Sequence, residues 1–384
     1  MPAQTSYRAE VLSSWDAAAP RWQRMRERSV GTPFQAPHWL ETWYGALGSQ
    51  KNVEPVLVAV ADRSDEDVLL IPFVRRSLGP LRTIEFADGW ATDYNAPLIG
   101  ERAPRNVHDA QALWRAVVEA LPHADRIRLT KMPVEVRGQA NPLALLSSCR
   151  NSETHGYIVD LPERFEDYES SLKKDLRSLL RRRWDRLIKD TKAELRWISD
   201  PDEGLRVFET LEQQQRARLQ SQGARHIFDQ AHYQEFYRRH VANGLASGGA
   251  VVTTIVASGE IVATFLGVTD GYCCTLIRSS QLWGEAWDRY GLGKLIISRS
   301  IRELHARGHR QFDLSIGDFA YKHDFGVRAV SMVELDVARS WRALPSVCGD
   351  FTWDWLRKNR YTGSVARSAR KALSFRERRA TPMP

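Results

Sequence analysis

The sequence lacks the features that mark membrane, secreted and metal-binding proteins. Its longest apolar run, Val68 to Val74, contains a proline and is far shorter than the roughly 20 residues of a membrane-spanning helix. Its first ten residues contain no apolar segment of the kind found in signal peptides. The four cysteines are Cys149, Cys273, Cys274 and Cys348. Their spacing fits no metal or redox site, so we expect reduced packing residues, no bound metal and a cytoplasmic location.

Excess positive charge is missing from most of the chain. The 384 residues include 55 Lys and Arg against 47 Asp and Glu, which gives a formal net charge of +8. Residues 357–384 hold nine of these basic residues and one acidic residue, Glu377, so the preceding 356 residues carry no net charge. Nucleic-acid-binding domains more often spread positive charge over a face of the folded body. The distribution argues against a nucleic-acid partner.

The basic segment continues a helical pattern that begins near residue 341. Apolar residues recur there at helical spacing, at Leu344, Val347, Phe351 and Trp355. We therefore expect residues 341–384 to form a basic amphipathic helical tail. Such a tail suits an anionic membrane surface, which would place the protein at the inner face of the plasma membrane. Clustered arginines also suit bidentate phosphate binding, as in cyclic di-GMP. A solvated tail without a partner is the remaining alternative.

The predicted elements occur in the same order in both halves of the chain. The first half has helical patterns near residues 9–27, 38–47 and 107–121, and strand patterns near 54–61, 67–75, 83–87, 94–99 and 126–130. The second half has helical patterns near 165–189, 202–220, 230–243 and 294–307, and strand patterns near 250–257, 261–268, 272–278, 311–316 and 331–337. The repeated order predicts two related α/β domains, residues 1–155 and 156–340.

A loop with two glycines, Gly291 and Gly293, separates a predicted strand from a predicted helix. Backbone N–H groups at such a helix start can bind a phosphate or pyrophosphate, and Lys294 in the first turn adds a positive charge. An ordinary turn that needs glycine flexibility gives the same pattern. The loop alone leaves both interpretations open.

Four short motifs add a wider pattern between about residues 30 and 335. They are FQAPHWL at 34–40, DYNAPL at 93–98, SLKK at 171–174 with Arg177 and Arg181, and DLSIGD at 313–318 with Tyr321 and Lys322. In this order they resemble the GNAT acyltransferases, and more closely the FemAB-related group that includes CelD-like and holdfast-type polysaccharide acyltransferases. The resemblance implies an α/β fold with two tandem GNAT-like domains, each a mixed, mainly antiparallel sheet flanked by helices. The first domain would be degenerate and lie on the acceptor side.

The resemblance also implies catalytic residues after the last strand of the second domain. GNAT enzymes hold CoA between two splayed strands, here 272–278 and 311–316. Tyr321 has the place of the acid that protonates the leaving thiolate. Lys322 resembles a lysine near the acyl group or a substrate phosphate, and Asp318 or Asp313 would act as a base or orient Lys322. A packed Tyr321 and a solvated Lys322 form the alternative.

Acetyl-CoA or another acyl-CoA is the cofactor that the resemblance implies. The family's pyrophosphate loop is expected to begin with Gln or Arg three residues before its first glycine, but Asp288 occupies that place. We expect the adjacent Arg289 to replace it, together with Gly291, Gly293 and Lys294.

Acceptor-binding candidates come from both halves of the chain. His38, Asp93, Tyr94 and Asn95 are expected to line a cleft between the domains, although each also suits a turn or cap. Arg278 is a charged residue in an otherwise apolar strand. It either binds an anionic substrate or is a solvated side chain at the end of the strand. The segment 173–189 contains eight basic residues, which form a solvated helix face or attract an anionic substrate.

These features predict an N-acyltransferase that moves an acyl group from acyl-CoA to an amino sugar. The acceptor would belong to an exopolysaccharide or cell-envelope polysaccharide precursor, either a polysaccharide or a lipid-linked sugar. Two alternatives remain open at this point. One is a FemAB-type aminoacyl-tRNA-dependent peptidoglycan aminoacyltransferase. The other is a non-catalytic scaffold at the membrane that responds to cyclic di-GMP.

Overall fold

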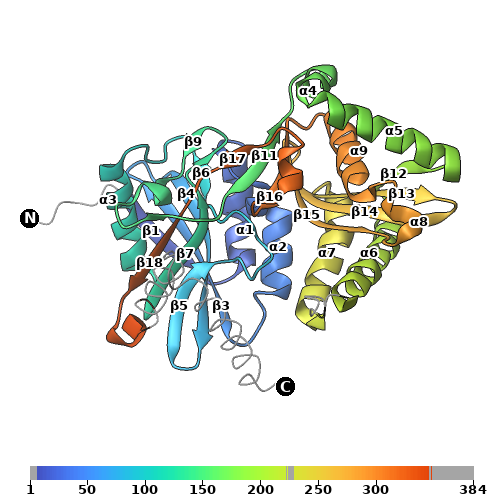
Figure 1. The fold of residues 1–384 in the computed structure, drawn as a ribbon. Coiled ribbons are helices and arrows are strands. Elements are labelled where there is room, and N and C mark those ends of the chain that lie inside the picture. The colour runs from blue at the N-terminus through green and yellow to red at the C-terminus, as the bar shows by residue number, and fades with distance from the viewer. Residues whose placement is uncertain (1–6, 222, 224–228, 346, 348–384) are drawn as a thin grey trace, which may run out of the picture.

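Two sheets with flanking helices lie side by side in the computed structural model (Figure 1). The structure describes residues 7–221, 223, 229–345 and 347. Of the expected tail at 341–384, the structure describes only residues 341–345 and 347, and Trp341–Ala343 form a short 3₁₀ helix. The basic part at 357–384, with the membrane and cyclic di-GMP interactions predicted for it, lies outside the described residues. None of the described helices has the length and apolar character that crossing a membrane requires.

The first sheet follows the order β1-β3-β4-β5-β7-β18-β10, with the short strands β2 and β6 paired at the side of this path. Its strands are β1 (Tyr7–Leu12), β2 (Ser29–Val30), β3 (Val53–Asp62), β4 (Asp67–Leu78), β5 (Leu81–Phe86), β6 (Leu98–Gly100), β7 (Arg126–Pro133), β10 (Arg150–Asn151) and β18 (Met332–Ala338). The other elements of this domain are α1 (Trp15–Arg26), α2 (Pro37–Ala46), α3 (Val107–Ala120), the hairpin β8 (Glu135–Val136) and β9 (Gln139–Ala140), and short 3₁₀ helices at Pro33–Gln35 and Pro142–Leu145.

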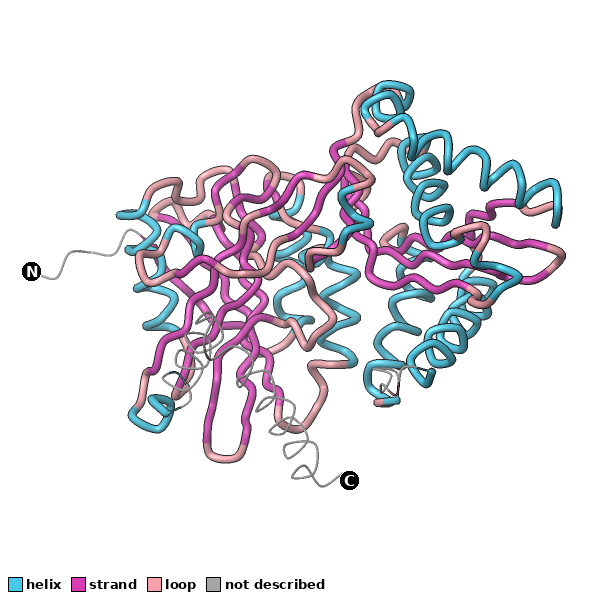
Figure 2. Tube along the Cα trace, viewed as in Figure 1, coloured by secondary structure: helices cyan, strands magenta, loops and turns pink. Residues whose placement is uncertain are grey.

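The second sheet follows the order β12-β13-β14-β15-β16-β11-β17. Its strands are β11 (Gly156–Asp160), β12 (Glu194–Ile198), β13 (Ala250–Ala257), β14 (Glu260–Thr269), β15 (Cys273–Gln281), β16 (Gln311–Ile316) and β17 (Arg328–Val330). Its helices are α4 (Phe165–Ser171), α5 (Lys174–Thr191), α6 (Pro201–Ser221), α7 (Ala231–Ser247), α8 (Glu285–Asp288), α9 (Leu292–Ala306) and α10 (Ala320–His323). Helices α6 and α7 cover one face of this sheet, and α5 and α9 cover the other (Figures 1 and 2).

Three of the predicted elements differ from the structure. The expected helix from residue 9 is the strand β1 as far as Leu12, and the helix begins only at Trp15, where the Ser14 side chain accepts a hydrogen bond from the Ala17 N–H. The expected strand at 94–99 is loop except for its last residues, in β6. The single helix expected at 165–189 is two helices, because the backbone of Leu172 and Lys173 is extended.

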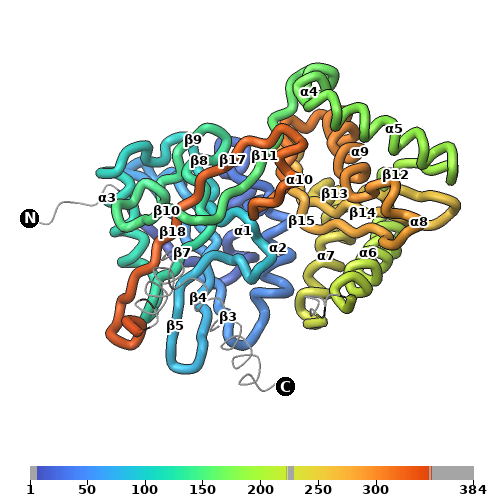
Figure 3. The backbone as a smooth tube through the Cα atoms, in the orientation of Figure 1, coloured from blue at the N-terminus to red at the C-terminus, as the bar shows by residue number. Residues whose placement is uncertain are grey.

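The last strand of the described residues returns to the first sheet (Figure 3). β18 runs antiparallel to both β7 and β10. The Arg126 guanidinium binds the Asp336 carboxylate across this pairing, with a distance of 2.7 Å between Nε and Oδ1. The residue range expected for the second domain, 156–340, therefore contains a strand that lies in the first sheet.

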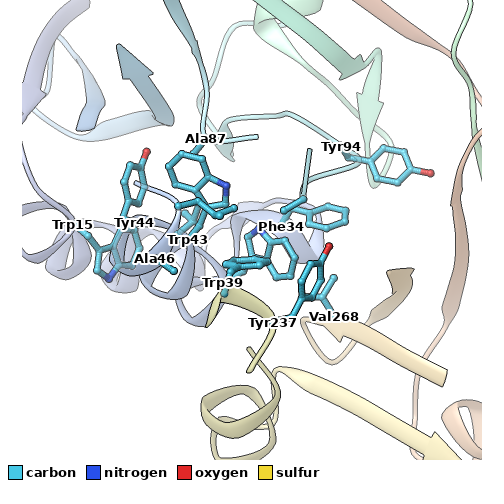
Figure 4. Close-up of a cluster of buried hydrophobic side chains, with 14 of the residues drawn as sticks. Trp15, Phe34, Trp39, Trp43, Tyr44, Ala46, Ala87, Tyr94, Tyr237 and Val268 are labelled. Carbon is cyan, nitrogen blue, oxygen red and sulfur yellow. The ribbon is translucent and has the colours of Figure 1, made fainter. Parts of the chain in front are cut away.

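A shared core joins the two domains (Figure 4). The Trp39 ring on α2 lies edge-on to Phe236 and to His240 of α7, each at a centroid distance of 5.0 Å. Trp39 and Phe236 are completely buried. Burial of this much aromatic surface fixes α2 against α7, and with them the position of one domain on the other.

Candidate functional site

The two parallel strands in the second sheet separate part-way along their length. β15 and β16 pair only from Cys273 to Thr275 and from Gln311 to Asp313. Beyond this point β15 runs on to Gln281 and β16 to Ile316, without further pairing between these described strands. The register of β15 with β14 also skips Ile277, which forms a bulge. The edge of β15 that faces β16 is therefore open to a ligand.

A cavity of about 750 Å³ lies at the open end of β15, and we call it the strand-end cavity. Residues of β15, α5, α6 and α9 contribute to its wall. Four of the lining residues are cationic and none is acidic, counting only residues that the structure describes; the four are Arg183, Arg218, Arg278 and Lys294. A wall with this charge suits a ligand that carries several phosphate groups.

The glycine loop lies on this cavity and makes room for polar side chains. Gly291 has a left-handed backbone, with a φ of 61°, just before α9. A Cβ atom at this position would lie 2.3 Å from Nη1 of Arg183, and one at Gly293 would lie 2.4 Å from Oε1 of Gln281. The loop therefore places a guanidinium beside the N-terminal end of α9, where the helix dipole also favours an anion.

Arg289 does not line the strand-end cavity, although the sequence suggested it for cofactor binding. Its guanidinium instead lies 2.5 Å from the Tyr290 hydroxyl and 3.4 Å from the Asp190 carboxylate. Asp288 accepts a hydrogen bond from the Gly284 N–H at the start of its own short helix. Arg183 takes the place beside the glycine loop, and its helix lies more than 100 residues earlier in the chain.

Tyr321 lies on the strand-end cavity, as do Arg278, Gly291, Gly293 and Lys294 of the predicted set. Burial raises the pKa of the Tyr321 phenol, so the group stays protonated at neutral pH. It is a proton donor beside the parted strands. Lys294 forms an ion pair with Asp324, with 2.6 Å between Nζ and Oδ2.

Lys322 and Asp318 point away from this cavity. Lys322 is only 2% exposed, and its Nζ donates to the backbone carbonyls of Ser315 and Ile316 at 2.9 and 2.8 Å. Burial lowers its pKa to about 8. Asp318 is exposed and pairs with His323 at 2.7 Å. Lys322 therefore holds the end of β16 in place, and the predicted trio with Tyr321 is not assembled at one point.

Two carboxylates lie where the strands part, Asp313 buried and Asp93 half-buried, and they connect the domains. Asp313 accepts hydrogen bonds from the Tyr94 hydroxyl at 2.9 Å, from the Thr275 hydroxyl at 3.1 Å and from the Ser315 N–H at 2.7 Å. Asp93 accepts from the Ser315 hydroxyl at 2.6 Å. Burial raises the pKa of Asp93, and it raises that of Asp313 to about 7. Both carboxylates are thus more basic than an exposed aspartate.

A second cavity, of about 430 Å³, lies between the domains, and we call it the Trp90 cavity. Asn95 lines it and donates to the Asp88 carboxylate and the Thr130 carbonyl, each at 2.9 Å. Residues Gln230, His232 and Tyr233 of the second domain close its other side. The DYNAPL motif thus lies between this cavity and the parted strands.

The remaining two acceptor candidates have packing contacts. His38 lies in the contact of α2 with α7, with its ring 6.3 Å from that of His240, and burial lowers its pKa to about 4. It lines neither cavity. Arg278 donates to the Tyr237 hydroxyl at 3.0 Å and lies over the Tyr237 ring. It lines the strand-end cavity, and its positive charge partly offsets the rise that burial causes in the pKa of Asp93.

Comparison with protein families identifies the second domain. Residues 174–323 match the acetyltransferase (GNAT) domain. This segment of the second domain is therefore similar to GNAT acetyltransferase domains. The match includes the parted strands, the glycine loop and Tyr321, and it confirms the family resemblance at this level. A search of curated protein sequences found no match.

Solved structures extend the likeness to both domains. The structure of FemX is 11% identical, with a TM-score of 0.57 over 82% of this chain and 95% of FemX. The C-terminal domain of a putative lysylphosphatidylglycerol synthetase from Agrobacterium fabrum is 13% identical, with a TM-score of 0.53 over 87% of this chain and 96% of that domain. A conserved protein of unknown function from Bacteroides thetaiotaomicron VPI-5482 is 12% identical, with a TM-score of 0.50 over 86% of this chain and 99% of that protein. These likenesses concern the fold, and they confirm the predicted tandem arrangement around the GNAT domain.

Proposed function

We propose that the protein transfers an acyl group from acyl-CoA to the amino group of a sugar in an exopolysaccharide or cell-envelope polysaccharide precursor. The observation that carries the proposal is the strand-end cavity, whose four cationic residues lie against the open edge of β15. CoA combines a pyrophosphate and a further phosphate with an extended amide chain. The cationic wall and the open strand edge match these two parts.

Each part of the donor has a matching group in the cavity. Arg183 and the N–H groups at the start of α9 would bind the pyrophosphate. The pantetheine amides would hydrogen-bond to the open edge of β15, as an added strand does. Arg218, which lies over the Trp283 ring at 4.6 Å, would face the nucleotide. The thioester would then lie near Tyr321, at the parted strands.

The chemistry follows from the groups around that point. The acceptor nitrogen attacks the thioester carbonyl, so a C–N bond forms and the C–S bond breaks. The bulge at Ile277 provides a backbone N–H for the negative oxygen of the intermediate. Asp93 takes the proton from the nitrogen, and Tyr321 gives a proton to the leaving thiolate. The products are an N-acyl sugar and free CoA.

An acyl-transfer assay tests this proposal. The protein is incubated with acetyl-CoA and glucosamine oligosaccharides, and both thiol release and the mass of the product are measured. We expect one acetyl group per thiol released and loss of this activity in the Asp93→Asn variant. Thiol release at the background rate, with no acetylated product from any amino sugar, would contradict the proposal.

An aminoacyl-tRNA is a second candidate donor, because a basic groove of about 520 Å³ lies between α5 and α9. Its basic residues are Lys174, Arg177, Arg181, Arg299 and Arg302. Such a groove could follow a nucleic-acid backbone beyond the strand-end cavity. The same assay with charged tRNA in place of acetyl-CoA decides between the donors. Transfer from tRNA alone would assign the protein to the aminoacyl class.

A further inference from the structure

Trp90 is an exposed aromatic residue in an unfavourable backbone conformation. It is 82% exposed, the largest fraction among the exposed large hydrophobic residues of the described chain. Its φ is 59°, in the left-handed region that bulky residues rarely adopt. Strain of this kind persists where the surroundings fix it, and it is often found at binding sites. A large apolar ring that is exposed to solvent, on a residue with a strained backbone, indicates a binding function.

The loop that carries Trp90 is held firmly. The Trp90 N–H donates to Oδ1 of Asp88 at 2.9 Å, and the Asp88 carbonyl accepts from the Trp43 indole at 3.1 Å. Lys131 joins this network through Asp88 at 2.7 Å and through the carbonyl of Thr92 at 2.6 Å. The backbone that carries the ring is therefore fixed, which saves a ligand the entropy of ordering the loop.

The walls of the Trp90 cavity are polar but largely neutral. Arg76 pairs with Glu85 at 2.5 Å, and Lys131 pairs with Asp88, so two of the three lysine and arginine side chains that line it are neutralised. Burial lowers the pKa of His232, which keeps this ring uncharged at neutral pH. These walls suit a ligand with many hydroxyl groups, in contrast to the cationic strand-end cavity.

The cavity also leads towards the reacting groups. Asp93 follows Trp90 by three residues in the same loop, and its side chain reaches Ser315 at the end of β16. Lys131, Asp88 and Arg278 are close enough to influence the pKa of Asp93. A ligand unit in the Trp90 cavity would therefore lie against the loop that carries this carboxylate, three residues before it in the chain.

We propose that the Trp90 cavity is a carbohydrate-binding subsite, in which one face of a pyranose ring stacks on the Trp90 indole. The C–H groups on a sugar face carry a slight positive charge and match the negative face of the ring. The hydroxyl groups would bond to the paired side chains of Asp88, Lys131 and His232. The inference deepens the proposed function, because it rests on that function for the role of the bound sugar as the acceptor.

A binding experiment without a donor tests the subsite. The full chain is titrated with a glucosamine tetrasaccharide, and heat and tryptophan fluorescence are recorded. The Trp90→Ala variant keeps the same backbone conformation but loses the ring, and we expect affinity to fall on the order of tenfold, the scale of one stacking contact. Trp90→Phe should retain most of the affinity. Trp341→Ala, which removes another tryptophan that is 76% exposed, is the matched control and should bind as the wild type does.

The possible results separate this inference from the proposed function. Loss of binding in Trp90→Ala, with normal affinity for acetyl-CoA and an unchanged circular dichroism spectrum, supports the subsite even if no acyl transfer is detected. Equal affinities of the wild type and Trp90→Ala overturn it, and so does the absence of binding to the wild type at millimolar tetrasaccharide. Tighter binding of a free nucleotide than of the sugar at Trp90 would overturn it as well.

Discussion

Burial sets the protonation states of the side chains at the parted strands. It raises the pKa of Tyr321, so the phenol can donate a proton, and it raises the pKa of Asp93, so the carboxylate can accept one. Lys322 is buried without a carboxylate partner among the described residues and bonds only to backbone carbonyls. The neighbouring residues 321 and 322 therefore differ: the first is a protonated phenol on the strand-end cavity, and the second holds the end of β16.

Replacing Tyr321 by Phe removes the proton donor and leaves the ring. We expect kcat for acyl transfer to fall by about 10² to 10³, because the thiolate then leaves without general acid assistance. The dissociation constant for acetyl-CoA should change less than twofold or so, since the ring still fills its place. Steady-state kinetics and calorimetric titration measure the two effects. A wild-type kcat in this variant would show that another group protonates the leaving thiolate.

Replacing Asp313 by Asn tests whether the pKa of this buried carboxylate is raised, because a raised pKa makes the free energy of unfolding depend on pH. Its pKa in the folded protein is about 7, against an ordinary value of 3.8, so the folded state binds this proton more tightly than the unfolded state. The resulting stabilisation is complete below about pH 4 and is lost as the pH rises through 7. The wild type should therefore lose stability relative to the Asn variant between these values, by up to about 1.4 kcal/mol per pH unit. Urea unfolding at pH 4.5, 6 and 8 measures the difference in unfolding free energy between the wild type and the Asn variant. A difference that does not change with pH would contradict the prediction.

The sequence revealed some of these residues but not others. Tyr321 could be predicted because it follows a strand within a motif, and Gly291 because the loop pattern is local. Arg183 and Trp90 could not, since the first is a single member of a basic helix and the second lies just before the DYNAPL motif and outside it. Their positions depend on contacts between segments that are distant in the chain.

The glycine loop shows how one backbone conformation positions an element. Gly291 adopts a positive φ immediately before α9, and this turn directs the N–H groups of the helix to the strand-end cavity. Arg183 of α5 occupies the space that a side chain at this position would fill. The loop thus joins the start of α9 to α5 at the point where the donor phosphates would bind.

Replacing Gly291 by Ala should weaken donor binding as well as stability. The left-handed backbone costs about 1 kcal/mol with alanine, and the new methyl group displaces the flexible end of Arg183. Gly308→Ala is the control, because Gly308 also has a positive φ, of 91°, and has open space around it. Both variants should lose similar stability in thermal unfolding, but only Gly291→Ala should bind acetyl-CoA several-fold more weakly. Equal affinities of the two variants for acetyl-CoA would show that the glycine loop does not bind the donor.

Helices and strands were predicted well where the pattern was long. The helix α9 and the strands β13 to β16 lie within a few residues of their expected positions. The break between α4 and α5 was missed because Leu172 and Lys173 carry no proline or glycine signal, and Leu172 is instead held extended while it packs in the core. The short strands β2, β10 and β17 were missed because two or three residues show no period.

The two domains share a core, and the first sheet takes a strand from the end of the described chain. The aromatic contact of α2 with α7 is fully buried, and β18 completes the first sheet after the chain has passed through the second domain. Neither sheet can lose its order without exposing apolar surface of the other domain. The sequence predicted two repeats but not the return of β18, because strand pairing over 200 residues has no local signal.

This sharing predicts that the chain unfolds in one cooperative step. Calorimetry should give a single transition whose calorimetric and van't Hoff enthalpies agree. Trp39→Ala, which removes a buried ring between the domains, should lower the midpoint of that transition, with a cost of about 3–5 kcal/mol, and leave it single. Two resolved transitions in the wild type would show that the domains unfold separately.

The most direct test of the account is calorimetric titration of the protein with acetyl-CoA. We expect one binding site per chain, a roughly tenfold loss of affinity in Arg183→Ala from the lost charge-assisted hydrogen bonds, and no change in Arg186→Ala, an exposed residue of the same helix that does not line the cavity. Absence of binding at millimolar acetyl-CoA, or equal affinities in the two variants, would contradict the assignment of the strand-end cavity to the acyl donor.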